Sequence, residues 1–221
     1  MKNMEVEIII FDLDDTLYPS SSGVWTLIRE RIDLFMISKL NYTVHNVHSA
    51  REQFFKEFGT TLRGLESVHH IDPMEYLQFV HNIPIHRLLF PNIILSRILS
   101  EIKQRKVIFT NGDRWHAKRV TDSLNITENF DEVIDILDVS PYCKPMKESF
   151  EIAFRKLNIF DPQKALLIDD SLRNIQAAKN LGLQTIWVKE VDNHDHRDFS
   201  HIRSIEELII GFPAIFQHEE K

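Results

Sequence analysis

The sequence predicts an α/β protein with a doubly wound, mainly parallel sheet and a small helical block inserted after the first strand. From residue 91 onwards, short apolar runs alternate with helical periodicity, which is typical of parallel sheets covered by helices. Residues 18–90 show helical periodicity and no strand pattern. We therefore expect a main domain formed by residues 1–17 and 91–221, and an inserted helical domain formed by residues 18–90.

The first predicted strand, Val6 to Phe11, is apolar apart from Glu7, as expected for a strand that is buried on both faces. Residues two apart in a strand point the same way, so Asp12 and Asp14 are predicted to project together past its end. Two neighbouring carboxylates beside an apolar core repel each other and are costly to bury unless a cation neutralises them. Taken alone, they could also simply cap a turn, where Asp is common.

The inserted block begins after a polar link, residues 18–23. Apolar residues then recur at intervals of three and four from Val24 to Leu40, which predicts an amphipathic helix. The rest of the block is predicted as a helix from Val47 to Phe58, an interruption from Gly59 to Leu65, and a shorter helix from Pro73 to His81.

The remainder of the chain alternates predicted strands and helices. The predicted strands are Lys106–Phe109, Glu132–Ile136, Ala165–Ile168 and Gln184–Val188. The predicted helices are Asn92–Lys103, Arg114–Leu124, Lys147–Leu157, Leu172–Leu181 and Ser204–Phe212, and the polar segment Val191–His201 is predicted as an exposed loop. In doubly wound sheets ligands bind beyond the carboxyl ends of the strands, so polar clusters that follow these strands should share one edge.

Composition narrows the class of function. The 221-residue chain is 43% hydrophobic and 27% charged, as in ordinary globular proteins. A net charge of −7 argues against a surface that coats nucleic acid. No apolar run approaches the ~20 residues of a membrane-spanning helix, and the single cysteine, Cys143, excludes an internal disulfide. We expect a cytoplasmic protein whose partner is a small molecule, without bulk nucleic acid or membrane; the oligomeric state stays open.

Four polar clusters are predicted to lie on the ligand-binding edge: Asp12 with Asp14, Thr110 with Asn111, Lys144 with Pro145, and Asp169 with Asp170. Each cluster alone has a simpler explanation, such as an ordinary turn, a solvated lysine or N-capping of the next helix. Together, those explanations do not account for acids, a hydroxyl group and a lysine at the one edge where this architecture binds ligands.

Oxygen ligands without a Cys/His cluster favour a hard cation, Mg²⁺ first. A lysine beside the cation would balance a dianionic substrate. A carboxylate cannot approach a phosphate dianion unless the phosphate charge is neutralised, so this combination is what phosphoryl transfer requires.

The clusters, in this order, resemble the four motifs of the haloacid dehalogenase (HAD) superfamily: Asp12-Leu13-Asp14-Asp15-Thr16, Thr110-Asn111, Lys144-Pro145 and Ile168-Asp169-Asp170-Ser171. The resemblance implies a Rossmann-like core. It also implies that Asp12 is a nucleophile that forms an aspartyl-phosphate, and that Asp14 protonates the leaving oxygen and then activates water. Thr110 would bind the transferring phosphoryl group, and Lys144 would hold nucleophile and phosphate in register.

The resemblance further implies an Mg²⁺ ion held by the Asp12 carboxylate, the Asp14 backbone carbonyl and Asp170. Asp169 would be a more distant or water-mediated ligand.

Four segments also look like the yeast and plant pyrimidine 5′-nucleotidase branch of that superfamily: residues 11–18, 58–65, 143–145 and 168–171. In the superfamily, an insertion after the first strand is a cap that closes over the substrate, so we call residues 18–90 the cap and the rest the core. Arg63 is the first candidate for contacting the leaving group, because a guanidinium binds phosphate bidentately or stacks on a base. An exposed arginine at a helix end is the alternative. Tyr18 and Asn111 are the other predicted substrate contacts.

We therefore predict a Mg²⁺-dependent phosphomonoester hydrolase acting on a small soluble ester, with a nucleoside 5′-monophosphate, a pyrimidine one first, as the leading substrate. The alternatives within the superfamily are a sugar-phosphate or phosphoglycolate phosphatase, or a phosphomutase. A dehalogenase fits less well, because Asp14 and the acidic pair Asp169-Asp170 suit a metal-assisted phosphatase. From another class, a non-catalytic binding module with the same fold is possible, although no nucleophile, lysine or metal acid is missing.

Overall fold

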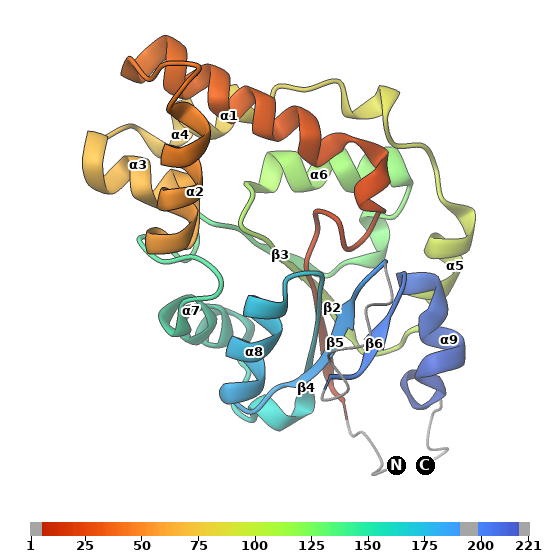
Figure 1. Cartoon of the computed structure of the whole chain (residues 1–221). Coiled ribbons are helices and arrows are strands. Elements are labelled where there is room, and N and C mark those ends of the chain that lie inside the picture. The colour runs from red at the N-terminus through yellow and green to blue at the C-terminus, as the bar shows by residue number, and fades with distance from the viewer. Residues whose placement is uncertain (1–5, 191–198, 217–221) are drawn as a thin grey trace.

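The computed structural model of the chain describes residues 6–190 and 199–216, and its centre is a parallel sheet (Figure 1). Among these residues the sheet has six strands in the order β3-β2-β1-β4-β5-β6, and every neighbouring pair is parallel. The predicted α/β class with a mainly parallel sheet is thus confirmed. The strands are β1 (Ile8–Phe11), β2 (Arg105–Phe109), β3 (Glu132–Ile134), β4 (Ala165–Asp169), β5 (Gln184–Val188) and β6 (His201–Ile202).

β1 lies in the middle of the sheet, where the strand order reverses. Phe11 at its end pairs with Ile108 of β2 on one side and with Ile168 of β4 on the other. Ligands of doubly wound sheets bind beyond the carboxyl ends of the strands at such a reversal. Because Asp12 directly follows β1 and Asp169 ends β4, two of the predicted acids lie at this point.

Helices cover both faces of the sheet (Figure 1). Side chains alternate between the two faces along a strand, so Ile8 and Ile10 of β1 join the apolar cluster under α7 and α8. Ile9 and Phe11 join the larger cluster formed with α5, α6 and α9. This double burial explains the nearly continuous apolar run of β1. The helices are α5 (Ile93–Glu101), α6 (Arg114–Leu124), α7 (Lys147–Leu157), α8 (Leu172–Asn180) and α9 (Leu208–Gly211).

The four cap helices gather beyond the carboxyl ends of the strands (Figure 1). α1 packs on α2 and α4, and α2 packs on α3. Inside the cap, the Phe35 ring meets Tyr76 and Phe79 edge to face, with centroids 5.1 and 5.4 Å away. None of the helices in the described part of the chain combines the length and the apolar composition that a membrane crossing requires. The cap helices are α1 (Val24–Leu40), α2 (Val47–Phe58), α3 (Thr61–His69) and α4 (Pro73–Val80).

Among the predicted elements, α1, α2, α6, α7 and β5 match the structure residue for residue, and β1, β2, β3, β4, α4, α5 and α8 differ from it by one or two residues at one or both ends. The main exception in the cap is α3, because the interruption predicted from Gly59 to Leu65 covers only two residues. Gly59 ends α2 with a φ of 83°, and the Thr60 side chain caps α3 by accepting from the Arg63 backbone N–H at 3.2 Å. The glycine and threonine cluster therefore marks a change of helix rather than a loop.

The C-terminal segment differs more from the prediction. The predicted loop Val191–His201 lies mostly outside the described residues, and its last residue starts β6, a strand that the sequence pattern does not predict. The helix predicted from Ser204 to Phe212 begins as a 3₁₀ turn, Ile205–Glu207, and continues as an α-helix for one turn only. The Ser204 side chain, which precedes this turn, makes no capping hydrogen bond. Further 3₁₀ turns are Ser20–Ser22, Ile85–Arg87, Thr127–Asn129, Pro162–Lys164 and Pro213–Ile215.

Gly64 of α3 lies against Phe54 of α2, and a β-carbon at this position would overlap the Phe54 side chain. Alanine normally stabilises a helix interior by about 1 kcal/mol relative to glycine. Here we expect Gly64→Ala to lower the free energy of unfolding by about 1–3 kcal/mol, because the α2–α3 contact becomes overpacked. Urea denaturation measures this change.

The matched control is Gly211→Ala in α9, where a β-carbon would meet Ile202 only at an ordinary contact distance of 3.7 Å. It should be neutral or slightly stabilising. Equal losses of stability at both positions would contradict the steric explanation.

Candidate active site

Lys144 lies between two carboxylates at the carboxyl edge of the sheet. Its Nζ donates to Asp12 Oδ1 and to Asp169 Oδ2, both at 2.7 Å, and the residue is 1% exposed. Burial alone would lower the pKa of Lys144, but the two carboxylates outweigh it and raise the pKa above its ordinary value. Lys144 is therefore a buried cation that joins the end of β1 to the end of β4.

The loop that carries Lys144 is fixed by Asn111. The Asn111 amide donates to the Lys144 carbonyl oxygen, and its Oδ1 accepts from the Lys144 N–H, both at 2.9 Å. The sequence predicts Asn111 as a substrate contact, whereas this side chain is engaged with the backbone of Lys144. Asn111 thus positions Lys144, and because it also lines the cavity described below, its contact with the substrate stays a prediction.

Asp169 is surrounded by protein donors. Besides Lys144, its oxygens accept from Asn174 Nδ2 at 2.9 and 3.0 Å and from the Ser171 backbone N–H at 2.9 Å. These bonds occupy most of the acceptor positions of the carboxylate. The geometry therefore suits holding Lys144 better than binding a cation directly.

Asp12 and Asp170 have fewer donors: Asp12 accepts from Lys144 and, at 3.5 Å, from the Thr16 hydroxyl, and no donor to the Asp170 carboxylate is found among the described residues. Carboxylate oxygens of Asp12, Asp169 and Asp170 lie within 4.8 Å of one another. Burial, partly offset by Lys144, raises the pKa of Asp12 to about 7, and burial with the neighbouring acids raises the pKa of Asp170 to about 9. The ionised cluster is thus short of positive charge, and its oxygen donors fit a hard divalent cation such as Mg²⁺. Asp12 and Asp170 are the carboxylates available to it.

One oxygen of Asp14 is held by two donors. Oδ1 accepts from the Tyr18 hydroxyl at 2.5 Å and lies 2.7 Å from His116 Nε2. Within the described residues, Oδ2 has no hydrogen-bond partner. Burial acts to raise the pKa of Asp14, but His116 and the Tyr18 hydroxyl outweigh it, so the pKa is lowered. Asp14 therefore has one anchored oxygen and one free oxygen on the wall of the site.

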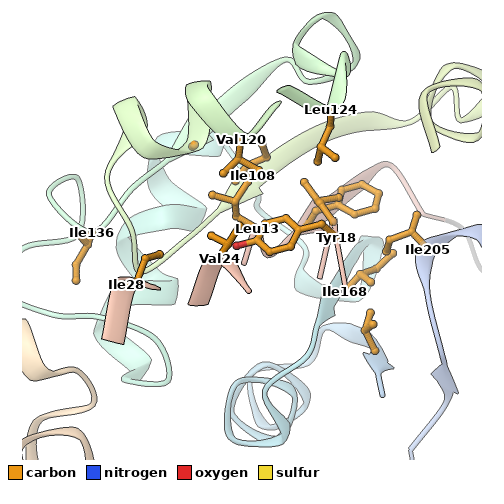
Figure 2. Close-up of a cluster of buried hydrophobic side chains, with 14 of the residues drawn as sticks. Leu13, Tyr18, Val24, Ile28, Ile108, Val120, Leu124, Ile136, Ile168 and Ile205 are labelled. Atoms are coloured by element: carbon orange, nitrogen blue, oxygen red, sulfur yellow. The ribbon is translucent and has the colours of Figure 1, made fainter. Parts of the chain in front are cut away.

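Tyr18, a predicted substrate contact, is a buried support for Asp14. It is 4% exposed, and Figure 2 shows its ring among apolar side chains that include Leu13 and Val24. Its hydroxyl donates to Asp14, and Tyr18 does not line the cavity described below. The prediction of a direct substrate contact is corrected accordingly.

His116, His81 and Asp113 belong to the site, although the sequence pattern does not predict them. The His116 ring stacks on the His81 ring, with centroids 4.2 Å apart and an interplanar angle of 13°. His81 Nδ1 lies 2.5 Å from Asp113 Oδ2, and Asp113 caps α6 by accepting from the His116 N–H at 2.8 Å. A helix that begins at the ligand-binding edge places its first turn beside the ligand. The position of His116 three residues after an N-capping Asp could have identified it.

Thr110 follows β2 and is 1% exposed. Its Oγ accepts from the Gly112 N–H at 2.9 Å, and no acceptor for its own proton is found among the described residues. The hydroxyl can therefore donate into the cavity that Thr110 lines, which suits the predicted contact with a phosphoryl oxygen.

Arg63 ties the cap to the core. It is 5% exposed, its Nη2 donates to the carbonyl oxygens of Ile136 at 2.6 Å and Tyr142 at 2.8 Å, and its Nη1 donates to Glu66 at 2.6 Å. Arg63 does not line the cavity. The predicted contact with the leaving group and the alternative of an exposed arginine are both corrected, because the guanidinium is buried against a core loop.

A cavity of about 540 Å³ lies between the cap and the carboxyl edge of the sheet. The structure brings the predicted catalytic residues Asp12, Asp14, Thr110 and Lys144 together on its core wall, with Asp170 beside them. Side chains of α1, α2, α3 and α4 form the cap wall. The cavity therefore offers a polar, charged end and a more apolar end.

Comparison with known proteins identifies the family. Residues 6–182 match the profile of the haloacid dehalogenase-like hydrolases. The chain belongs to this hydrolase family. The confirmed resemblance accounts for the four motifs on one edge of the sheet.

Two named relatives of this HAD hydrolase concern phosphate chemistry. Phosphate metabolism protein 8 of Saccharomyces cerevisiae is 26% identical over 191 residues, which cover 80% of this chain and only 60% of that protein. Glyceraldehyde 3-phosphate phosphatase of Pyrococcus abyssi is 28% identical over 202 residues, which cover 83% of this chain and 82% of that protein. The family and such relatives support a phosphatase.

Solved structures share the fold. The HAD hydrolase YfnB from Bacillus subtilis, bound to magnesium, has a TM-score of 0.62 at 20% identity, covering 93% of this chain and 98% of that one. L-2-haloacid dehalogenase from Xanthobacter autotrophicus has a TM-score of 0.59 at 15% identity, covering 94% and 99%. At these identities the likeness concerns the fold alone.

We predict that Mg²⁺ binds more tightly as the pH rises from about 6 to 9, because Asp12 and Asp170 must lose their protons to bind it. Without a cation, the folded protein retains protons on these carboxyls that the unfolded chain has lost. Stability in EDTA should therefore fall as the pH rises through this window. Thermal unfolding with Mg²⁺ and with EDTA across the range measures both effects.

Asp170→Asn is the control for this prediction. It should remove most of the Mg²⁺ response and, by deleting a buried charge, raise stability in EDTA at high pH. A Mg²⁺ effect that is independent of pH, or that persists in Asp170→Asn, would count against a cation at this cluster.

Arg63→Ala should lower the free energy of unfolding by about 2–4 kcal/mol, because it leaves the carbonyl oxygens of Ile136 and Tyr142 without their donor. The control is Arg97→Ala, whose side chain is 80% exposed in a single ion pair with Glu101 and should change stability by no more than about 0.5 kcal/mol. Chemical denaturation compares the two. Similar small effects would argue that the tie between cap and core is weak.

Proposed function

We propose that this HAD hydrolase hydrolyses phosphate monoesters through an aspartyl-phosphate intermediate. The observation that carries the proposal is the buried contact of Lys144 with Asp12 and Asp169, at one end of a cavity that Thr110 and Asp14 also line. A fixed cation, a carboxylate nucleophile, a hydroxyl donor and a second carboxylate are the groups that two-step transfer of a phosphoryl group requires.

In the first step, Asp12 attacks phosphorus. A bond forms between an Asp12 carboxylate oxygen and phosphorus, and the bond from phosphorus to the ester oxygen breaks. Lys144 holds Asp12 Oδ1 at 2.7 Å and so fixes the direction of the carboxylate. The Thr110 hydroxyl donates a hydrogen bond to a phosphoryl oxygen, and this bond stabilises the charge that develops in the transition state.

Asp14 is the proposed acid and base. In the first step its free Oδ2 gives a proton to the leaving oxygen, which requires the protonated form of Asp14, a minority of the molecules because its pKa is lowered. In the second step the same oxygen takes a proton from a water molecule, which attacks phosphorus and releases phosphate and Asp12. Tyr18 and His116 anchor Oδ1, so Oδ2 keeps one direction through both steps.

Mg²⁺ is the proposed cofactor, held by the carboxylates of Asp12 and Asp170 and by the Asp14 backbone carbonyl, with Asp169 set behind them. When bound, it supplies positive charge that lets a carboxylate approach a phosphate dianion. Asp169 holds Lys144 in place for the same purpose.

A nucleoside 5′-monophosphate, a pyrimidine one first, is the proposed substrate. A cavity of about 540 Å³ whose cap wall is partly apolar supports a leaving group larger than a three-carbon chain. Glyceraldehyde 3-phosphate is the second candidate, favoured by the names of relatives such as that of Pyrococcus abyssi. The competing functions are a sugar-phosphate or phosphoglycolate phosphatase, a phosphomutase and a non-catalytic binding module. We propose that the protein acts in the cytoplasm and that its partner is a small dissolved phosphate ester.

The test is phosphate release from a panel of nucleotide, sugar and triose monophosphates, with Mg²⁺ and with EDTA. We expect Mg²⁺-dependent release that favours UMP or CMP, and we expect Asp12→Asn to lower turnover by more than about 10³-fold because no nucleophile remains. Release that favours glyceraldehyde 3-phosphate would retain the mechanism and replace the substrate.

Asp72→Asn provides a control for the substitution itself. It makes the same chemical change at the N-cap of α4, where Asn caps as well as Asp, and should leave turnover unchanged. Full activity of Asp12→Asn would exclude the covalent mechanism, and no release from any ester would favour the binding module.

A further inference from the structure

Arg51 of α2 lines the cap wall of the cavity and has a nitrogen without a partner. Its Nε lies 3.4 Å from Asp33 Oδ1 on α1, and its Nη2 lies 3.2 Å from His48 Nδ1. Its Nη1 is buried and has no hydrogen-bond partner among the described residues. Leaving a buried donor unsatisfied is costly, so such a donor on a cavity wall indicates a ligand that accepts from it.

Tyr76 of α4 is a second donor on the same wall. It is 3% exposed, it lines the cavity, and no hydrogen bond joins its hydroxyl to another residue in the described part of the chain. Burial raises the pKa of Tyr76, so the hydroxyl keeps its proton and can donate it. The cap wall therefore carries a cationic donor and a neutral donor, both suited to an oxygen acceptor.

The spacing of residues along α2 indicates how far Arg51 lies from the Lys144 end of the cavity. Arg51, Phe55 and Gly59 follow one another at intervals of four residues and line the cavity from one face of the helix. Gly59 adjoins Lys144, because a β-carbon on it would lie 3.6 Å from the Lys144 carbonyl oxygen. Gly59 is the C-cap of α2 and follows Arg51 by eight positions, so their backbones lie roughly 12 Å apart along the helix axis at 1.5 Å per residue.

A short leaving group does not cover that distance. With bonds of about 1.5 Å, a three-carbon chain spans only roughly 4 Å. The wall between the two ends is apolar where Ile28, Ile32 and Leu77 line it, which favours an apolar or flat body between the phosphate and the acceptor.

We infer that Arg51 and Tyr76 form a recognition subsite for a hydrogen-bond acceptor oxygen at the far end of the leaving group. The inference rests on the proposed phosphatase function and deepens it. The substrate class is a phosphate monoester whose leaving group has an apolar or ring-shaped body and ends in a carbonyl or carboxylate oxygen. A triose phosphate bound at Lys144 leaves this subsite empty.

The test compares two enzymes and two substrates. Uridine 5′-monophosphate carries ring carbonyl oxygens, and ribose 5-phosphate is the same ester without the base. Arg51→Met should lower kcat/KM for uridine 5′-monophosphate by roughly 10- to 100-fold, the range for a hydrogen bond to a charged group. It should change kcat/KM for ribose 5-phosphate less than about twofold, which also reports that the variant is folded.

Two further variants distinguish recognition of the substrate by the subsite from a structural role of these residues in the cap. Tyr76→Phe removes only the hydroxyl and should give a selective loss of about 3- to 10-fold for the nucleotide. Arg31→Met is the matched control, because Arg31 donates to the Phe79 carbonyl oxygen at 2.8 and 3.1 Å inside the cap and does not line the cavity. It should affect both substrates equally or not at all.

Equal losses on both substrates with Arg51→Met would overturn the inference, as would wild-type enzyme that uses ribose 5-phosphate as well as the nucleotide. If wild-type enzyme released phosphate from neither of these esters nor from any other ester of the panel, the proposed function would fail instead. Calorimetric binding of uridine 5′-monophosphate in EDTA then decides the subsite: weaker binding to Arg51→Met supports it, and equal or undetectable binding to both proteins refutes it.

Discussion

The contact of Lys144 with Asp12 and Asp169 is the constraint on which the site depends. A lysine that is 1% exposed must be paired, and its two partners come from the ends of adjacent strands, β1 and β4. Two asparagines support these contacts. Asn111 holds the loop that carries Lys144, and Asn174 donates to the Asp169 carboxylate. With the lysine used in this way, the remaining acids are left with too little positive charge. The same arrangement that buries one cation therefore creates a place for another.

The cap is part of this arrangement, and its contacts with the core are specific. Arg63 reaches from α3 to the loop that leads into Lys144, and His81 at the end of α4 meets Asp113 and stacks on His116. His116 in turn contacts Asp14. The cap thus touches the neighbourhoods of both Lys144 and Asp14, while its four helices supply the wall opposite them. Substrate recognition and catalytic geometry share the same supports.

The fold and the catalytic edge could be predicted because both follow from local patterns. Apolar runs buried on both faces predict parallel strands, and the strand order places the residues after them at one edge. The sequence assigns Arg63, Tyr18 and Asn111 to the substrate because each is a polar side chain near a motif. Their partners are decided by the folded chain: Arg63 meets Tyr142, 79 residues away, whereas the Tyr18 hydroxyl meets Asp14, only four residues away. A side chain's chemistry indicates what it can bind, and tertiary packing decides which partner it meets.

The wide spacing of the site along the chain has a consequence for biosynthesis. Lys144 and Asp12 are 132 residues apart, and Asp169 lies a further 25 residues on, so this contact closes a long loop. The four cap helices, by contrast, come from consecutive residues and can form through short-range contacts while the ribosome is still translating. A nascent chain that has emerged only as far as α7 carries Asp12 without β4, the strand that supplies Asp169. The protein therefore gains its reactive centre late, after the cap that restricts access to it has had time to fold.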